Sequence, residues 1–210
     1  MSDAPQWLRE LAVAASQMES GPLKPPADGG GKPSAVLILF ATDRQSGPDL
    51  LLIQRSDGLR HHPGQPAFPG GSIEAADDGP VAAALREAVE ETGLDLAGVD
   101  VLGTLPELFI PRTGFRVVPV LAWWRRPCAV APVDPAEVAA VERVPLSELA
   151  DPATRVLVRG ASGYASPAFR VRGMLVWGFT ALIIDRLLRL GGWERPWDAS
   201  TVVDVPMRAR

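Results

Sequence analysis

Three glutamates, Glu87, Glu90 and Glu91, stand within five consecutive positions of a stretch that favours a helix. Carboxylates three or four residues apart on a helix repel each other, and each pair costs about 0.2–0.5 kcal/mol. Either water must solvate this acidic face or a strongly positive group must bind it. Carboxylate oxygens are the ligands that Mg²⁺ and Mn²⁺ prefer. The spacing alone therefore leaves two interpretations, a solvated surface and a site for a divalent cation.

The corner that precedes the helix favours the cation site. Gly70 and Gly71 follow a proline there, and glycine adopts backbone conformations that a Cβ would prevent. The chain can therefore bend sharply and bring the Gly71 carbonyl near the helix. Arg86 stands four residues before Glu90 and can pair with it along the helix. We expect this pair to hold Glu90 in position while the other two glutamates face outward.

The helix itself is expected over residues 81–92. At about 100° per residue its three glutamates share one side, so the opposite side should pack on a sheet. That opposite side comprises Val81, Leu85, Ala88, Val89 and Thr92. Gly93 can adopt the left-handed conformation that ends a helix.

The rest of the chain must supply the elements that hold this helix. Apolar runs predict strands at residues 35–41, 49–56, 99–108, 115–124, 141–144 and 169–171. The first two should form a hairpin. Helices are predicted at residues 7–17 and 176–190, the first with Leu8, Leu11 and Ala15 near one face. Because strands and helices do not alternate regularly, the order favours an α+β fold with a mixed sheet covered by helices.

Composition and charge exclude several classes of protein. Lys and Arg number 21 and Asp and Glu 25, so the net charge is −4, which gives no general attraction to nucleic acid or to an anionic membrane. The longest apolar run, residues 173–184, is too short to span a bilayer and predicts a buried helix. The single cysteine, Cys128, excludes an intramolecular disulfide. No secretory signal is expected, so the expected location is cytoplasmic, and a homodimer is left open.

Residues 86–94, REAVEETGL, resemble the second half of the signature box of the Nudix hydrolases at every fixed position. The first half departs from the box, because Asp78 stands where the family has Glu and is separated from Gly71 by six residues instead of five. Asp78 is also suited to capping the helix. The resemblance implies the Nudix fold, an α/β/α sandwich with a mixed sheet between helices, and hydrolysis of a nucleoside diphosphate linked to another moiety.

The resemblance also implies roles for single residues. It assigns catalysis to Arg86, Glu90, Glu91 and Glu137, and metal binding to Glu87, Glu90, Glu91 and Gly71. The ligand from Gly71 would be its carbonyl, and the cation would be Mg²⁺ or Mn²⁺. The general base would be Glu90, Glu91 or the loop residue Glu137.

The stretch before the box, residues 51–71, resembles a longer pattern of Nudix enzymes similar to coenzyme A pyrophosphatases. Only Ile53 differs from that pattern. The resemblance implies that Arg55 and Arg60 bind phosphate oxygens through their forked donors. It further implies that coenzyme A or acyl-coenzyme A is the substrate, a nucleotide-containing small molecule, and that the products are 3′,5′-ADP and 4′-phosphopantetheine.

The resemblance covers residues 35–190, which we interpret as the Nudix domain. Residues 1–34 form an N-terminal helix and a Pro/Gly-rich arm before it, and residues 191–210 a C-terminal tail after it. Other functions remain open: a Nudix enzyme for ADP-ribose or a dinucleotide, a Nudix-like sensor that binds a nucleotide without cleaving it, or a scaffold with an acidic helix.

Overall fold

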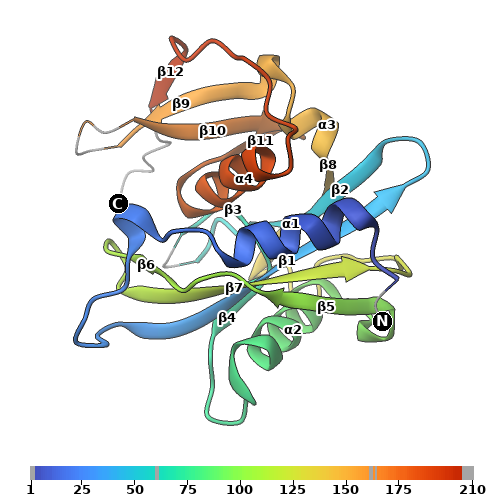
Figure 1. Cartoon of the computed structure of the whole chain (residues 1–210). Coiled ribbons are helices and arrows are strands. Elements are labelled where there is room, and N and C mark those ends of the chain that lie inside the picture. The colour runs from blue at the N-terminus through green and yellow to red at the C-terminus, as the bar shows by residue number, and fades with distance from the viewer. Residues whose placement is uncertain (1–2, 60–61, 161–162, 164, 205–210) are drawn as a thin grey trace.

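The computed structural model describes residues 3–59, 62–160, 163 and 165–204. Within these residues, eight strands form a mixed central sheet (Figure 1). They are β1 (Lys32–Asp43), β2 (Gly47–Arg55), β3 (Pro66–Ala67), β4 (Gly70–Ser72), β5 (Val99–Thr104), β6 (Leu108–Ile110), β7 (Phe115–Trp124) and β8 (Val138–Pro145). The order is β3-β2-β1-β7-β5, with β4 beside β1, β6 beside β7 and β8 beside β2. β1 runs parallel to β7, and the predicted hairpin of β1 and β2 is confirmed.

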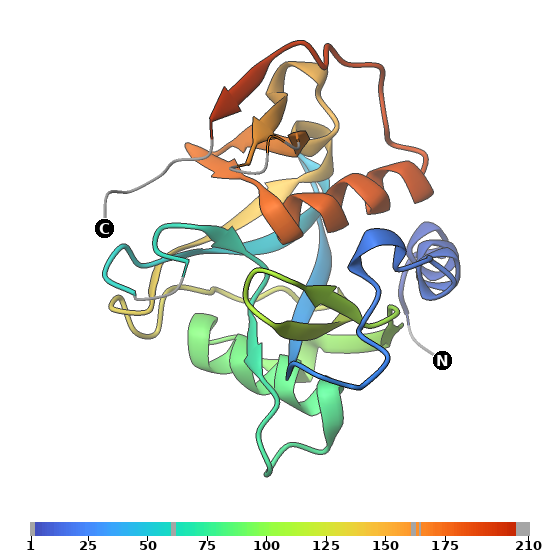
Figure 2. The same ribbon diagram turned by 90° about the vertical axis from the view of Figure 1, so that its left-hand side faces the viewer.

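Helices cover both faces of this sheet (Figures 1 and 2). The structure describes the α-helices α1 (Gln6–Ser16), α2 (Gly79–Thr92), α3 (Leu146–Leu149) and α4 (Gly178–Leu190), and the short 3₁₀ helices η1 (Gly21–Leu23), η2 (Leu96–Gly98) and η3 (Pro152–Thr154). Because side chains alternate along a strand, β1 serves two cores. Its Leu37 and Leu39 lie with the alanines of α2, whereas Ile38 and Phe40 lie with α1 and α4. The predicted α+β arrangement of a sheet between helices is therefore present.

A second sheet, of four strands among the described residues, packs along α4 (Figure 1). It contains β9 (Arg155–Arg159), β10 (Ala165–Val171), β11 (Met174–Val176) and β12 (Val202–Asp204). The helix predicted over residues 176–190 is confirmed as α4, but the apolar run of residues 173–184 is not helical throughout, because its first residues form β11. Arg172 and Gly173 both have positive φ and join β10 to β11 as a two-residue hairpin loop, which suits such turns. The helix starts only at Gly178.

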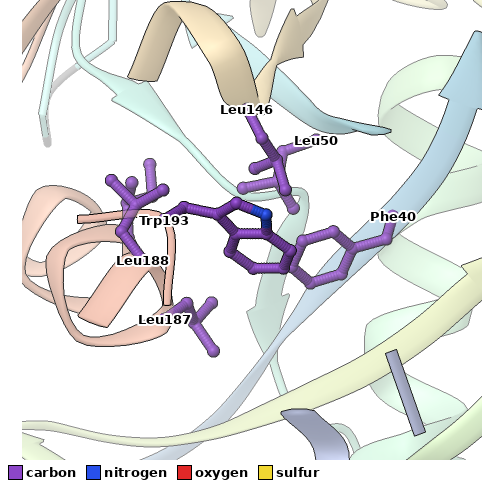
Figure 3. Close-up of a pocket in the computed structure, with 7 residues that line it drawn as sticks. Phe40, Leu50, Leu146, Leu187, Leu188 and Trp193 are labelled. Carbon is purple, nitrogen blue, oxygen red and sulfur yellow. The ribbon is translucent and has the colours of Figure 1, made fainter. Parts of the chain in front are cut away.

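Segments near both ends of the chain pack against the same core. The predicted first helix is confirmed as α1, and its Leu8, Leu11 and Ala15 are buried. Its Trp7 meets Phe40 and Trp193 edge to face, with ring centroids 5.7 and 5.3 Å apart. Figure 3 shows the indole of Trp193 between α4 and Phe40, at an apolar contact with no room for a water molecule. The domain boundaries at residues 34 and 190 stay a prediction, although side chains from both sides of each boundary share this core.

The described residues contain no helix that is both long and apolar enough to cross a membrane.

Candidate functional site

The acidic helix is α2, and Ala88 and Thr92 are buried on it as predicted, but the rest of its buried face differs in part from the prediction. Ala83, Ala84 and Ala88 are buried, and Glu91 is buried beside them, whereas Val89 is exposed. The small alanine side chains let the helix lie close to β1, and this turns the 84–88–91 side inward. The prediction that Val89 packs on the sheet is therefore wrong, and so is the prediction that Glu91 faces outward.

The three glutamates consequently differ in environment. The side chain of Glu91 is 6% exposed, that of Glu87 18% and that of Glu90 56%. Glu87 and Glu91 border the sheet, while Glu90 projects from the helix. Gly93, with φ of 69°, ends the helix as predicted, and its N–H donates to the carbonyl of Val89.

The glycine corner lies against this helix, as the sequence predicted. Gly70 donates its backbone N–H to Glu91 Oε2 at 2.9 Å. Gly70 has a φ of 156°, and a Cβ on it would stand 2.3 Å from the carbonyl oxygen of Ala35 on β1. Any other residue would therefore be forced out of this position. The corner fixes one carboxylate oxygen of Glu91.

Glu87 occupies the space beside the next residue of the corner. A Cβ on Gly71 would stand 2.3 Å from Glu87 Oε1. The backbone of Gly71 and the carboxylate of Glu87 are thus in close approach, which only a residue without a side chain permits. The structure brings together Gly71, Glu87 and Glu91, three of the four predicted metal ligands.

Arg86 connects the entry of the helix to its acidic side. Its Nη1 lies 2.9 Å from Glu90 Oε2 and 3.1 Å from Glu87 Oε1, so the predicted pair with Glu90 is confirmed. Its Nε and Nη2 donate to the two oxygens of Asp77, each at 3.0 Å, and Nη2 also donates to the carbonyl of Ser72. Arg86 therefore has partners on the helix and on the loop that leads into it.

Asp77 is the residue that sequence reasoning missed. Its side chain is 6% exposed, and hydrogen bonds from Arg86, followed by one from the Glu74 N–H, hold its pKa below the usual range. Asp78 stands at the N-cap position of α2, but its side chain makes no capping hydrogen bond. The capping role considered for Asp78 is wrong, and the carboxylate of this loop that pairs with Arg86 is that of its neighbour Asp77.

Arg55 and Glu137 approach the cluster from the opposite side. Arg55 Nη1 lies 3.6 Å from Glu91 Oε1. A β-bulge interrupts the pairing of β2 with β8 between Gln54 and Arg55, and bulges often re-aim a side chain near a functional site. Glu137 precedes β8, and its carbonyl accepts the N–H of Ser56. Arg60, predicted to bind phosphate, lies outside the described residues.

Burial outweighs the nearby positive charges at two carboxylates of this cluster. Burial raises the pKa of Glu91 to about 7, against the Gly70 N–H and the Arg55 guanidinium, which lower it. The charges of Glu87 and Glu137 raise it further. Burial also raises the pKa of Glu87, although Arg86 opposes the change. An additional cation would stabilise the ionised form of both glutamates.

Hard oxygen donors make up this cluster, and they fit a cation such as Mg²⁺. In the part of the chain that the structure describes, no three His, Cys, Asp or Glu side chains converge as a metal site. Glu90 is the most exposed of the three glutamates and pairs with Arg86. Mg²⁺, however, commonly takes one or two carboxylates and completes its shell with water and substrate phosphates. Glu87 and Glu91 would supply two carboxylates to such an ion, and the Gly71 backbone would supply a carbonyl.

Comparisons with known proteins bear on the family and the fold. A family model described as the NUDIX domain matches residues 31–161. A protein of Citrobacter koseri named uncharacterized Nudix hydrolase NudL is 38% identical over 167 residues, covering 73% of this chain and 81% of its own length. The NudL protein of Cronobacter sakazakii is 37% identical over 173 residues, covering 76% and 83%.

Two solved structures show the same fold. The Nudix hydrolase RenU of M. smegmatis aligns with a TM-score of 0.55 and 21% identity, covering 80% of this chain and 89% of RenU. A NUDIX hydrolase from Nitrosomonas europaea aligns with a TM-score of 0.50 and 12% identity, covering 83% and 80%. The Nudix fold predicted from the sequence is confirmed.

Proposed function

The chain belongs to the Nudix hydrolase family, and we propose that it hydrolyses the diphosphate bond of coenzyme A or acyl-coenzyme A. The products would be 3′,5′-ADP and 4′-phosphopantetheine or its acyl derivative. The observation that carries the proposal is the convergence of Glu87, Glu91, the glycine corner and Arg55 at one place. The pattern of residues 51–71, which ends in that corner, favours coenzyme A over other nucleoside diphosphate derivatives.

The cation would be held by Glu87, Glu91 and the Gly71 carbonyl, with Glu90 as a further ligand. Nudix enzymes generally use divalent metal ions, and we propose Mg²⁺ or Mn²⁺ because all these donors are hard oxygens. When bound, the cation would offset charge on the diphosphate and lower the pKa of a water molecule.

The side chains of the protein would position the metal ligands and the substrate, and one of them would deprotonate the attacking water. Arg86 keeps Glu87 and Glu90 in place through its own attachment to Asp77. A general base must reach the attacking water, and Glu90, Glu91 and Glu137 remain the candidates. Glu137 is the leading loop candidate, because it is exposed and its charge acts on Glu91. Arg55 and Arg60 would bind phosphate oxygens.

Incubation with four nucleotides and Mg²⁺ or Mn²⁺ tests the substrate class. Coenzyme A, acetyl-coenzyme A, ADP-ribose and NADH would be offered separately, and the products identified by mass. We expect 3′,5′-ADP from the two coenzyme A compounds and no products when EDTA removes the metal. Brisk cleavage of ADP-ribose or NADH beside intact coenzyme A would favour the alternative Nudix specificity. Binding without cleavage of any compound would favour a sensor.

Asp77→Asn is expected to lower kcat about tenfold to a hundredfold, the usual cost of losing a group that orients a metal ligand. Arg86 would lose one of the two carboxylate oxygens that accept its hydrogen bonds, and with it the ion pair. It would then hold Glu87 and Glu90 less firmly. The matched control is Asp78→Asn, which removes the same charge from an exposed neighbour without a side-chain cap. Steady-state kinetics of both variants would measure the difference, and equal losses would contradict the role of Asp77.

A further inference from the structure

Arg55 faces the oxygen of Glu91 that does not accept the Gly70 N–H. Glu91 Oε2 already accepts the Gly70 N–H at 2.9 Å, while Oε1 lies 3.6 Å from Arg55 Nη1. Each carboxylate oxygen has two lone pairs, and one of those on Oε2 is taken by Gly70. Oε1 is therefore the freer oxygen for a cation, and it is the one that lies beside the guanidinium. A guanidinium and a divalent cation beside the same carboxylate oxygen repel each other. The guanidinium and a divalent cation compete for the same carboxylate oxygen.

The position of Arg55 allows its guanidinium to move away from Glu91. It is the last residue of β2, its side chain is 29% exposed, and the bulge after Gln54 places it at the rim of the site. A long arginine side chain can swing while its backbone stays in the sheet. Among the described residues, Glu91 is the carboxylate within ion-pair distance of Arg55. Once a cation neutralises Glu91, the nearest strong anion for Arg55 would be a phosphate of the substrate.

We propose that Arg55 exchanges partners during the reaction cycle. It neutralises Glu91 before the metal arrives, is displaced when the metal binds, and then pairs with a phosphate of the substrate. This inference rests on the proposed function, because it requires the divalent cation and a phosphate-bearing substrate. It makes metal binding precede productive substrate binding. It also gives Arg55 opposite effects on two ligands, since it weakens metal binding and strengthens substrate binding.

Mn²⁺ titration of the full chain without substrate, by calorimetry, tests the exchange. In Arg55→Gln the competitor is gone, and we expect Mn²⁺ to bind about tenfold more tightly, within the usual range of couplings between sites. The same variant should show a higher KM for the substrate. The matched control is Arg44→Gln, which removes the same charge from an exposed turn, about 26 Å away along β2. Its Mn²⁺ affinity should stay at the wild-type value.

The outcomes separate the two proposals. Unchanged or weaker Mn²⁺ binding by Arg55→Gln, beside measurable binding by the wild type, would overturn the exchange and leave the proposed function standing. Equal tightening by Arg44→Gln would show a general charge effect and would also overturn it. If neither the wild type nor Arg55→Gln binds Mn²⁺, the metal site of the proposed function fails, and the exchange fails with it.

Discussion

Glu91→Gln is expected to lower the rate of hydrolysis about a thousandfold while making the metal-free protein more stable. The loss of rate follows because the amide removes the charge that holds the cation. A metal supplies several kcal/mol of charge stabilisation, and about 1.4 kcal/mol corresponds to a factor of ten. The gain in stability follows from burial, since Glu91 is 6% exposed and an amide is neutral at every pH.

The pKa of Glu91 sets the pH at which this gain appears. Burial raises the pKa to about 7 in the folded protein from an ordinary value of 4.5. The folded state therefore favours the protonated carboxyl, and its ionisation destabilises the fold progressively between pH 4.5 and 7. At pH 8 the ionised Glu91 lowers the free energy of unfolding of the wild type by about 3 kcal/mol, a cost that the glutamine variant avoids. At pH 5 the difference in free energy of unfolding between the two proteins should fall below about 1 kcal/mol.

Urea unfolding in EDTA at pH 5 and pH 8 would measure the difference. Adding Mg²⁺ at pH 8 should stabilise the wild type, because the cation neutralises the buried carboxylate, but not Glu91→Gln. Glu90→Gln serves as the control for stability, since that side chain is 56% exposed and its free energy of unfolding should change little. An unchanged rate in Glu91→Gln would refute its role as a ligand. A less stable variant at pH 8 would refute the electrostatic account.

The burial of Glu91 illustrates what the sequence could and could not predict. The spacing of the glutamates and Arg86 correctly predicted one helix, the pair with Glu90 and the approach of the glycine corner. The predicted buried face is right for Ala88 and Thr92 and wrong for Val89, which is exposed. Ala83 and Ala84, which the prediction omits, are buried as well, because alanine carries little weight in an apolar pattern although it permits the closest packing.

Asp77 was missed for a different physical reason. Its contact with Arg86 spans nine residues and depends on how the loop from Ser72 to the start of α2 folds. No periodic pattern governs such a loop. A carboxylate two turns or more before a helical arginine, just outside the helix, was the available signal. The family spacing drew attention to Asp78 instead.

The fold shows a similar division between local and non-local information. The strands at the centre of the main sheet carry long apolar runs and were predicted. The helix α4 was predicted to within two residues, but the strand β11 before it was not, because the apolar run of residues 173–184 has no period that separates strand from helix. The deciding feature was the pair Arg172 and Gly173, whose positive φ closes the hairpin. A single arginine in that conformation is not evident from its residue type.

Gly71→Ala is expected to lower activity about a hundredfold and to leave the fold intact. Gly71 does not have a positive φ, so alanine suits its backbone. The new methyl group would stand 2.3 Å from Glu87 Oε1 and 2.5 Å from its Cδ, and the end of that side chain is free to move away. Displacement of a catalytic group by about 1 Å can cost a factor of about 100. Mn²⁺ affinity should fall together with the rate.

Gly70→Ala is the comparison that separates the site from the fold. There the added Cβ would stand 2.3 Å from the carbonyl oxygen of Ala35 and 2.7 Å from the Cα of Val36. These are backbone atoms of β1, which cannot move without disturbing the sheet, and the φ of 156° adds strain. Thermal unfolding should therefore show a large loss of Tm for Gly70→Ala and little for Gly71→Ala. If Gly71→Ala instead hydrolyses its substrate at the wild-type rate, the observed position of Glu87 against the corner is not the one that catalysis requires.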